Sequence, residues 1–75
     1  MNIGKDIKEI RLKSLLSQEA FANALGVSFT TVNRWETGRS IPSYRAMKMI
    51  DDFCKENDID YKIGDVIFDG KAEHN

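Results

Sequence analysis

Residues 29–37 carry side chains that a helix would sort onto two faces. At 100° per residue, Val32 and Trp35 point one way, with Thr31 beside them. The opposite face would hold Phe29, Thr30, Asn33, Arg34 and Thr37. An arginine can bond both acceptors of guanine, an asparagine can bond adenine in the same two-point way, and a phenyl ring can contact a thymine methyl group. This face could therefore read base edges in a DNA groove; the alternative is an ordinary solvated helix surface.

The charges of the chain are distributed unevenly along its length. The net charge is −1, which taken alone argues weakly against a nucleic-acid partner. Residues 1–48, however, hold eight basic and four acidic side chains, a balance of +4, whereas residues 49–75 hold three basic and eight acidic ones, a balance of −5. Such asymmetry is typical of a basic working face with an acidic segment turned elsewhere, although two unrelated solvated surfaces would give the same count.

Composition excludes several other classes of protein. The 75 residues suffice for one small domain. Cys54 is the only cysteine and His74 the only histidine, so we expect no disulfide, no metal site, no cofactor and no enzyme built on histidine chemistry. The sequence shows no cluster of candidate acids, bases or nucleophiles either, so we expect that the protein is not an enzyme. The apolar runs are far shorter than the roughly 20 residues of a membrane span, and the first residues lack the pattern of a signal peptide. These features favour a cytoplasmic protein.

The apolar spacing and the capping residues predict four helices. Serine is a favoured residue at the start of a helix, and glycine is favoured just after its end. The predicted starts follow Ser17, Ser28 and Ser43, and two predicted ends precede Gly26 and Gly38. The predicted helices cover residues 3–14, 18–25, 29–37 and 44–57. On the third helix Trp35 is expected in the core rather than as a stacking platform, and on the fourth Cys54 is expected to be an inert buried thiol.

The chain after residue 58 follows a different pattern. Ile59, Tyr61 and Ile63 alternate with polar residues, and residues 65–70 form a short apolar run before a turn. We expect an irregular or short extended segment, or a single helical turn, with a frayed end at residues 71–75. The predicted division is a helical domain at residues 1–58 and an acidic, partly apolar segment at residues 59–75. This segment either forms a dimer surface or folds back on its own bundle, over the outward-pointing Leu12.

Several short motifs within residues 16–42 resemble one family. They are Ser17-Gln18 at the start of the second helix, Leu25-Gly26 before the turn, and Trp35-Glu36-Thr37-Gly38 after it. This combination resembles the phage repressor and Cro-type helix-turn-helix proteins, also called the xenobiotic-response-element family, over residues 3–58. The resemblance implies a compact lambda-repressor-like bundle of four or five helices that binds double-stranded operator DNA as a homodimer. The two-fold symmetry of such a dimer predicts that its site is an inverted repeat. It also implies a bacterial, phage or mobile-element origin.

The resemblance assigns further roles to individual residues. Gln18 matches a glutamine that contacts the DNA backbone, and the loop after the third helix matches a second phosphate clamp. The expected phosphate contacts are Gln18, Ser28, Thr37, Arg39, Ser40 and Arg45, while Phe29, Thr30, Asn33 and Arg34 are the expected base contacts. Arg11 and Glu36 match a structural salt bridge between the first and third helices. For Gln18 and the loop residues, ordinary surface positions are the alternative.

Two departures from the family pattern bear on these expectations. The turn at residues 14–16 lacks the glycine that is frequent there, and the usual fifth helix is replaced by a segment interrupted by glycine and aspartate. The function we expect is a sequence-specific transcriptional repressor. The alternative is an antitoxin-like protein-interaction module whose acidic C-terminal segment covers a basic partner.

Overall fold

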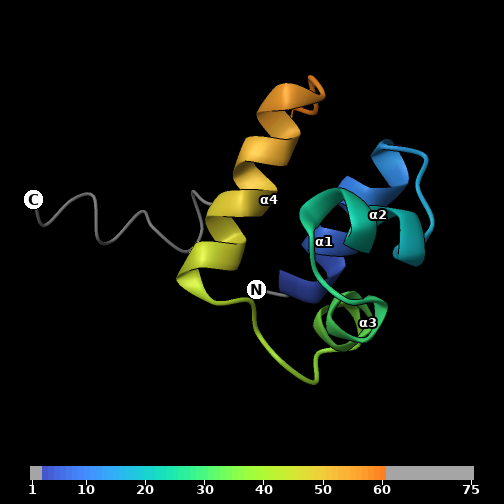
Figure 1. Ribbon diagram of the computed structural model, residues 1–75, viewed down its shortest axis with the longest axis vertical. Helices are drawn as coiled ribbons and strands as arrows, with labels where there is room; N and C mark the ends of the chain where they lie inside the picture. Colours follow the sequence, from blue (N-terminus) through green and yellow to red (C-terminus); the bar gives the residue numbers. More distant parts are fainter. Residues whose placement is uncertain (1–2, 61–75) are drawn as a thin grey trace, which may run out of the picture.

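The computed structural model describes residues 3–60, and within them the chain forms four α-helices and no strand (Figure 1). The helices are α1 (Ile3–Lys13), α2 (Gln18–Leu25), α3 (Phe29–Glu36) and α4 (Tyr44–Glu56). The predicted all-α class is confirmed, and every predicted helix boundary agrees to within one residue. The expectations for residues 61–75 lie outside the described residues.

Serine hydroxyl groups begin three of these helices, as the sequence predicts. The Oγ atoms of Ser17, Ser28 and Ser43 each accept a hydrogen bond from the backbone N–H three residues further on, at 3.0, 3.1 and 3.1 Å. Each bond satisfies one of the backbone donors that the first turn of a helix leaves without a partner. The short helices α2 and α3 are therefore delimited at their starts by local chemistry.

All four helices of the described region end in the same left-handed turn. Four residues just beyond the helix ends have positive φ angles: Leu15 at 60°, Gly26 at 79°, Gly38 at 78° and Asp58 at 55°. The N–H of the next residue then bonds the carbonyl five residues back, as in Leu16 to Arg11 at 3.2 Å and Val27 to Ala22 at 3.0 Å. This arrangement is the Schellman motif. Leu15 adopts the left-handed conformation in the turn where the family often has a glycine. The turn therefore forms here without a glycine.

The last of these turns directs Ile59 back toward the bundle. Its N–H donates to the carbonyl of Cys54 at 2.8 Å, and its half-buried side chain packs against the core. The sequence assigns Ile59 to a separate C-terminal segment, whereas the structure uses it to close α4. An apolar residue at this position of a Schellman motif commonly packs back on the helix that it follows.

Apolar side chains from all four helices form one buried cluster in the described region. Its members are Ile7, Ile10, Phe21, Ala22, Leu25, Val32, Trp35, Ala46, Met47, Ile50, Phe53 and Cys54. The rings of Phe21 and Phe53 meet edge to face with centroids 5.3 Å apart. Trp35 is only 4% exposed, which confirms its predicted place in the core. This cluster fixes α3 against α1 and α2, so that only the opposite face of α3 is open.

The N-terminal part of α1 lies directly against the C-terminal part of α3. Gly4 is buried there, and a Cβ atom at this position would overlap the carbonyl oxygen of Trp35 and lie 3.2 Å from that of Glu36. A glycine is therefore required at this crossing. Its role depends on a contact between distant parts of the chain, so the sequence analysis did not identify it.

Candidate nucleic-acid interface

The candidate interface begins with the packing of α2 against α3. Gly26 closes α2, Val27 follows it, and Ser28 begins α3 immediately afterwards. In Figure 1, α3 is seen end-on at the edge of the molecule, beside the loop that leads to α4. One face of α3 is therefore directed away from the bundle.

The outward face of α3 carries the polar side chains that the sequence predicts. Thr30 and Arg34 are exposed, Asn33 is half-buried, and the ring of Phe29 is 50% exposed. Val32 and Trp35 occupy the opposite face in the core. The structure thus brings the four predicted base-contacting residues together on one helix, although their contact with DNA stays a prediction.

Two predicted phosphate contacts serve as local caps. Ser28 accepts from the backbone N–H of Thr31, and its Oγ lies 2.9 Å from the Thr31 hydroxyl. The hydroxyl group of Thr37 donates to the carbonyl of Asn33 at 2.8 Å. Both residues are exposed, so they lie at the two ends of α3 with part of their hydrogen-bonding capacity already used.

A series of side-chain hydrogen bonds links α1, α2 and α3. Arg11 forms the ion pair with Glu36 through two bonds, Nε to Oε2 at 2.7 Å and Nη2 to Oε1 at 3.0 Å. The Oε1 atom of Glu36 also accepts from Nε2 of Gln18 at 3.0 Å, and Oε1 of Gln18 accepts from Nδ2 of Asn33 at 3.3 Å. The structure therefore contains the expected Arg11–Glu36 pair and extends it to two residues predicted to contact DNA.

This series of hydrogen bonds gives Gln18 surroundings that the sequence analysis missed. Gln18 is predicted to contact a phosphate of the DNA backbone, which stays a prediction; in the structure its side chain is half-buried and both ends of its amide are engaged. The residue types carry a partial signal, because amides and a carboxylate on adjacent helices favour hydrogen bonding. The pairing itself depends on how α1, α2 and α3 are packed.

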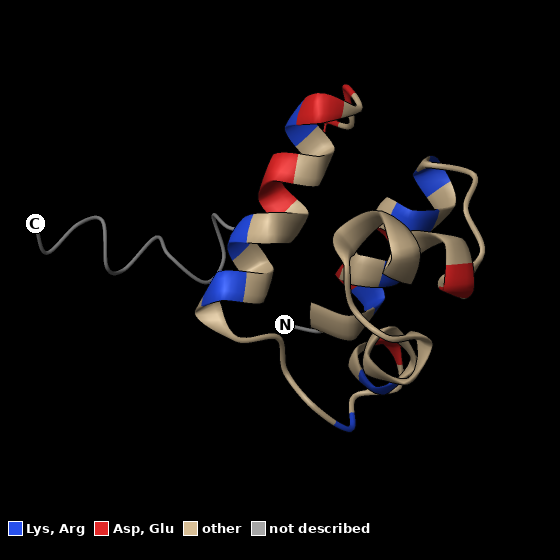
Figure 2. Ribbon diagram, in the orientation of Figure 1, with Lys and Arg blue, Asp and Glu red and all other residues tan. Residues whose placement is uncertain are grey.

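Three exposed arginines follow the polypeptide from α3 to the start of α4. Arg34 on α3, Arg39 in the following loop and Arg45 at the start of α4 are all exposed, whereas Ser40 is half-buried. Figure 2 shows one basic position in this loop, basic residues in the first part of α4, and mostly acidic residues over the later part of α4. The acidic part of α4 includes Asp51, which pairs with Lys55 at 3.2 Å. The charge asymmetry along the sequence is therefore also an asymmetry in space.

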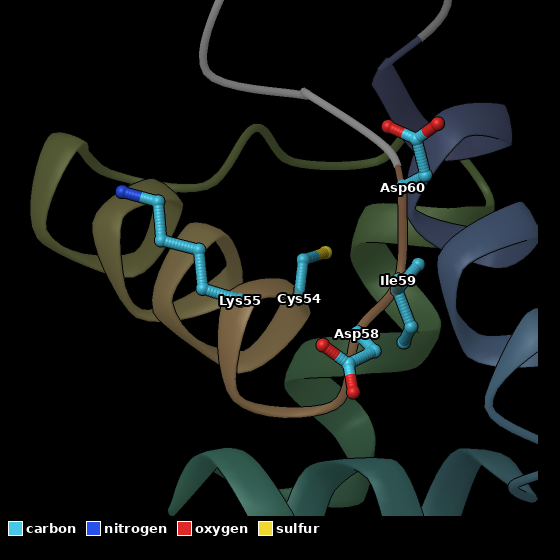
Figure 3. Close-up of a pocket in the computed structure, with 5 residues that line it drawn as sticks. All are labelled: Cys54, Lys55, Asp58, Ile59 and Asp60. Carbon is cyan, nitrogen blue, oxygen red and sulfur yellow. The ribbon is translucent and has the colours of Figure 1, made fainter.

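A hollow beside the end of α4 is lined by Cys54, Lys55, Asp58, Ile59 and Asp60 (Figure 3). The Cys54 side chain points toward the chain at Ile59 and Asp60, and the Lys55 side chain extends to the other side. Burial, together with the negative charge of Asp51, raises the pKa of the Cys54 thiol from 9.0 to about 11. A nucleophilic cysteine needs a lowered pKa, so this hollow does not have the chemistry of a thiol active site.

Among the described residues, no group of three acidic, histidine or cysteine side chains is placed to hold a metal ion. None of the described helices combines the length and the apolar character that crossing a bilayer requires.

The short turn between α2 and α3, together with the outward polar face of α3, defines a helix-turn-helix protein. The chain belongs to the helix-turn-helix family, whose model matches residues 7–61. This match confirms the resemblance stated from the motifs and supports a DNA-binding, regulatory role.

The chain is similar to parts of two curated proteins. The HTH-type transcriptional activator BcrR of Enterococcus faecalis is 32% identical over 53 residues, which cover 71% of this chain and 26% of that protein. The type II methyltransferase M.SsoII of Shigella sonnei is 40% identical over 55 residues, which cover 69% of this chain and 14% of that protein. No solved structure matches the chain significantly. The chain therefore spans only a small part of the length of each of these relatives.

Proposed function

We propose that this protein is a sequence-specific regulator of transcription that places α3 in the major groove of DNA. The observation that carries the proposal is the outward face of α3, where Thr30, Asn33 and Arg34 stand opposite the buried Val32 and Trp35. A recognition helix presents its N-terminal residues to base edges in this way. Phe29 adds an apolar group suited to a thymine methyl.

Contacts to the DNA backbone surround this helix in the proposed complex. Phosphate contacts fix the register of a protein on the duplex without reading its sequence. The residues assigned to them are Gln18, Ser28, Thr37, Arg39, Ser40 and Arg45. Arg39 and Arg45 supply most of the attraction, because they are exposed cations on the two sides of the loop between α3 and α4.

The active species in this proposal is a homodimer on an inverted repeat. A single α3 of 8 residues touches only a few base pairs, too few to select one genomic site. Two copies related by a two-fold axis would read half-sites about one helical turn apart. Sedimentation of the protein with an inverted-repeat duplex should give two chains per duplex. One chain per duplex, with protein in excess, would exclude the dimer.

The proposed effect on transcription is repression, because a protein bound over a promoter excludes the polymerase from it. BcrR is named an activator, so the direction needs its own measurement. A reporter gene placed behind the selected binding site should lose expression when the protein is produced. Increased expression would assign activation instead.

Selection of binding sites from random duplex DNA tests the central proposal. The purified protein should enrich a two-fold symmetric consensus, and binding to it should exceed binding to unrelated duplex at least 10³-fold, roughly the lower limit for specific binding proteins. Failure to enrich any sequence would contradict the proposal. Because the DNA of a bacterium or phage-infected cell lies in the cytoplasm, the proposal also places the protein there.

A second candidate function is supported by the acidic later part of α4. Asp51, Asp52 and Glu56 lie on this part of α4, away from α3 (Figure 2). In the antitoxin-like alternative this surface covers a basic partner protein. Purification from the native source should then yield a stoichiometric basic protein, released at high salt. Purification of the chain alone would favour the regulator.

A further inference from the structure

The series of hydrogen bonds from Arg11 through Glu36 and Gln18 to Asn33 has a defined direction. Its first acceptor is Glu36, a carboxylate that pairs with Arg11 and has only acceptor oxygens when ionised. Gln18 must therefore present its NH2 group to Glu36, as it does at 3.0 Å. The reverse orientation of the Gln18 amide would set its oxygen against a carboxylate oxygen with no proton between them. The carboxylate thus decides which way the Gln18 amide faces.

The orientation of Gln18 in turn decides the orientation of Asn33. With Nε2 of Gln18 turned to Glu36, its Oε1 faces α3 and accepts from Nδ2 of Asn33 at 3.3 Å. A flipped Asn33 would again bring two oxygens together. The Asn33 amide is therefore held with one N–H toward Gln18, and its other N–H and its Oδ1 remain for a ligand.

We propose that Gln18 is a positioning residue that fixes the donor and acceptor order of the Asn33 amide, and thereby the base that Asn33 selects. This inference rests on the proposed function. The remaining N–H and Oδ1 of Asn33 match the N7 acceptor and N6 donor that adenine shows in the major groove. Asn33 is thus expected to select adenine, and Gln18 to be required for that preference although it touches no base.

The Arg11–Glu36 pair that anchors these hydrogen bonds is largely buried. Arg11 and Glu36 are 11% and 4% exposed, and Nη1 of Arg11 also donates to the carbonyl of Leu16 at 2.9 Å. Glu36 Oε1 is held by both Arg11 and Gln18. A side chain fixed by buried partners loses less conformational freedom on binding, so the reading amide is ordered before DNA arrives.

Two substitutions of Gln18 separate positioning from backbone contact. Gln18→Ala removes both hydrogen bonds. Gln18→Lys keeps a donor for Glu36 and adds a positive charge for phosphate, but it offers no acceptor to Asn33. Both variants should lose discrimination at the adenine position, by part of the roughly 5- to 150-fold that a bidentate contact contributes. Gln18→Lys should lose this preference even where its overall affinity for DNA rises.

The measurement compares the selected duplex with duplexes changed at one base pair. Asn33→Ala identifies the adenine position, because its preference disappears there and persists at the others. In the Asn33→Ala background, Gln18→Ala should cause no further loss of discrimination at that position. A base preference unchanged in both Gln18 variants, with affinity shifted equally on all duplexes, would overturn the proposal and leave Gln18 as a phosphate contact.

The free protein supplies a readout that does not depend on DNA. In ¹⁵N spectra, the Nδ2 proton of Asn33 that bonds Gln18 should be shifted downfield and exchange slowly, and both effects should diminish in Gln18→Ala. Circular dichroism confirms that each variant is folded. Binding of no duplex by the native protein would overturn the proposed function, whereas binding with preferences independent of Gln18 would overturn only the positioning role.

Discussion

Arg11 on α1 and Glu36 at the end of α3 form a two-point ion pair, with bonds of 2.7 and 3.0 Å. The pair joins elements 25 residues apart in the sequence. Because Glu36 also accepts a hydrogen bond from Gln18, its carboxylate connects α1, α2 and α3.

Removal of both partners of this pair should cost less stability than the two single removals added together. Arg11→Met leaves the Glu36 carboxylate buried without its cation, and breaking a buried pair in this way costs about 3–5 kcal/mol. Urea denaturation followed by circular dichroism would measure the loss. The double variant Arg11→Met with Glu36→Leu should lose less than the sum of the single variants, since no unpaired charge remains. Additive losses would show that the two charges do not interact.

Gly4→Ala should destabilise the protein, although the same change usually stabilises a helix. Alanine is favoured over glycine by about 1 kcal/mol in a helix interior. At Gly4, however, the added methyl group would overlap the Trp35 carbonyl, and overpacking of this kind costs about 1–3 kcal/mol. Lys8→Ala, at an exposed position of the same helix, should be nearly neutral and serves as the control. A stabilised Gly4→Ala variant would contradict the close approach of α1 and α3.

Leu15→Gly should stabilise the protein. Leu15 has a φ of 60° and is 91% exposed, so its side chain contributes little packing while its backbone conformation is strained. Relief of the strain of about 1–2 kcal/mol outweighs the extra backbone entropy that glycine loses on folding, about 0.5–1 kcal/mol. Thermal denaturation should show a higher midpoint.

Gly38→Ala is the matched control for Leu15→Gly, because it makes the opposite kind of change in a turn with a similar φ angle. No atom lies within 4 Å of a Cβ built there, so Gly38→Ala adds strain at a φ of 78° without a clash. It should destabilise by about 1 kcal/mol. Equal stability of Gly38→Ala and the native protein would remove the basis for the Leu15 prediction.

The features that depend only on residues close together in the sequence, such as helix caps and helix faces, could be predicted from it. Ser17, Ser28 and Ser43 mark helix starts because a cap requires only the next three residues, and the apolar spacing identifies Trp35 as core. The alternative orientation of α3 would expose Val32 and Trp35 and bury Arg34, at a high free-energy cost. The two faces of α3 are therefore fixed by the order of its apolar and polar residues.

The remaining features depend on how the helices cross. Gly4 looks like an ordinary helix residue until α1 is placed against Trp35. Gln18 looks like a free polar residue until Glu36 and Asn33 are brought to it from another helix. Leu15 shows that a common glycine position is a preference rather than a requirement, because tertiary packing can impose the left-handed turn.

The Cys54 thiol should make the protein less stable at alkaline pH. Its pKa is raised to about 11, above the unfolded value near 9.0, so the folded state favours the neutral thiol. The contribution to stability is complete below pH 9 and is lost as the pH rises toward 11, because the unfolded state releases its proton first. Cys54→Ala should show a smaller fall in stability between pH 8.5 and 10.5, measured by urea denaturation. Equal falls in both proteins would show that other groups account for the alkaline loss.

Arg34 and Arg39 should affect DNA binding in different ways. Arg34 lies on the outward face of α3, so Arg34→Ala should change the base preference at one position by about 1–3 kcal/mol. Arg39 lies beyond the helix, where a phosphate is the expected partner, so Arg39→Ala should weaken binding to all duplexes alike. Loss of one phosphate contact should also reduce the slope of log affinity against log salt by about 0.9.

Lys55→Ala is the matched control, because it removes a positive charge from the acidic part of α4, and it should change neither preference nor slope. Fluorescence anisotropy over a series of salt concentrations measures both quantities. An altered consensus in Arg39→Ala, or an unaltered one in Arg34→Ala, would reverse the assignment of the two arginines.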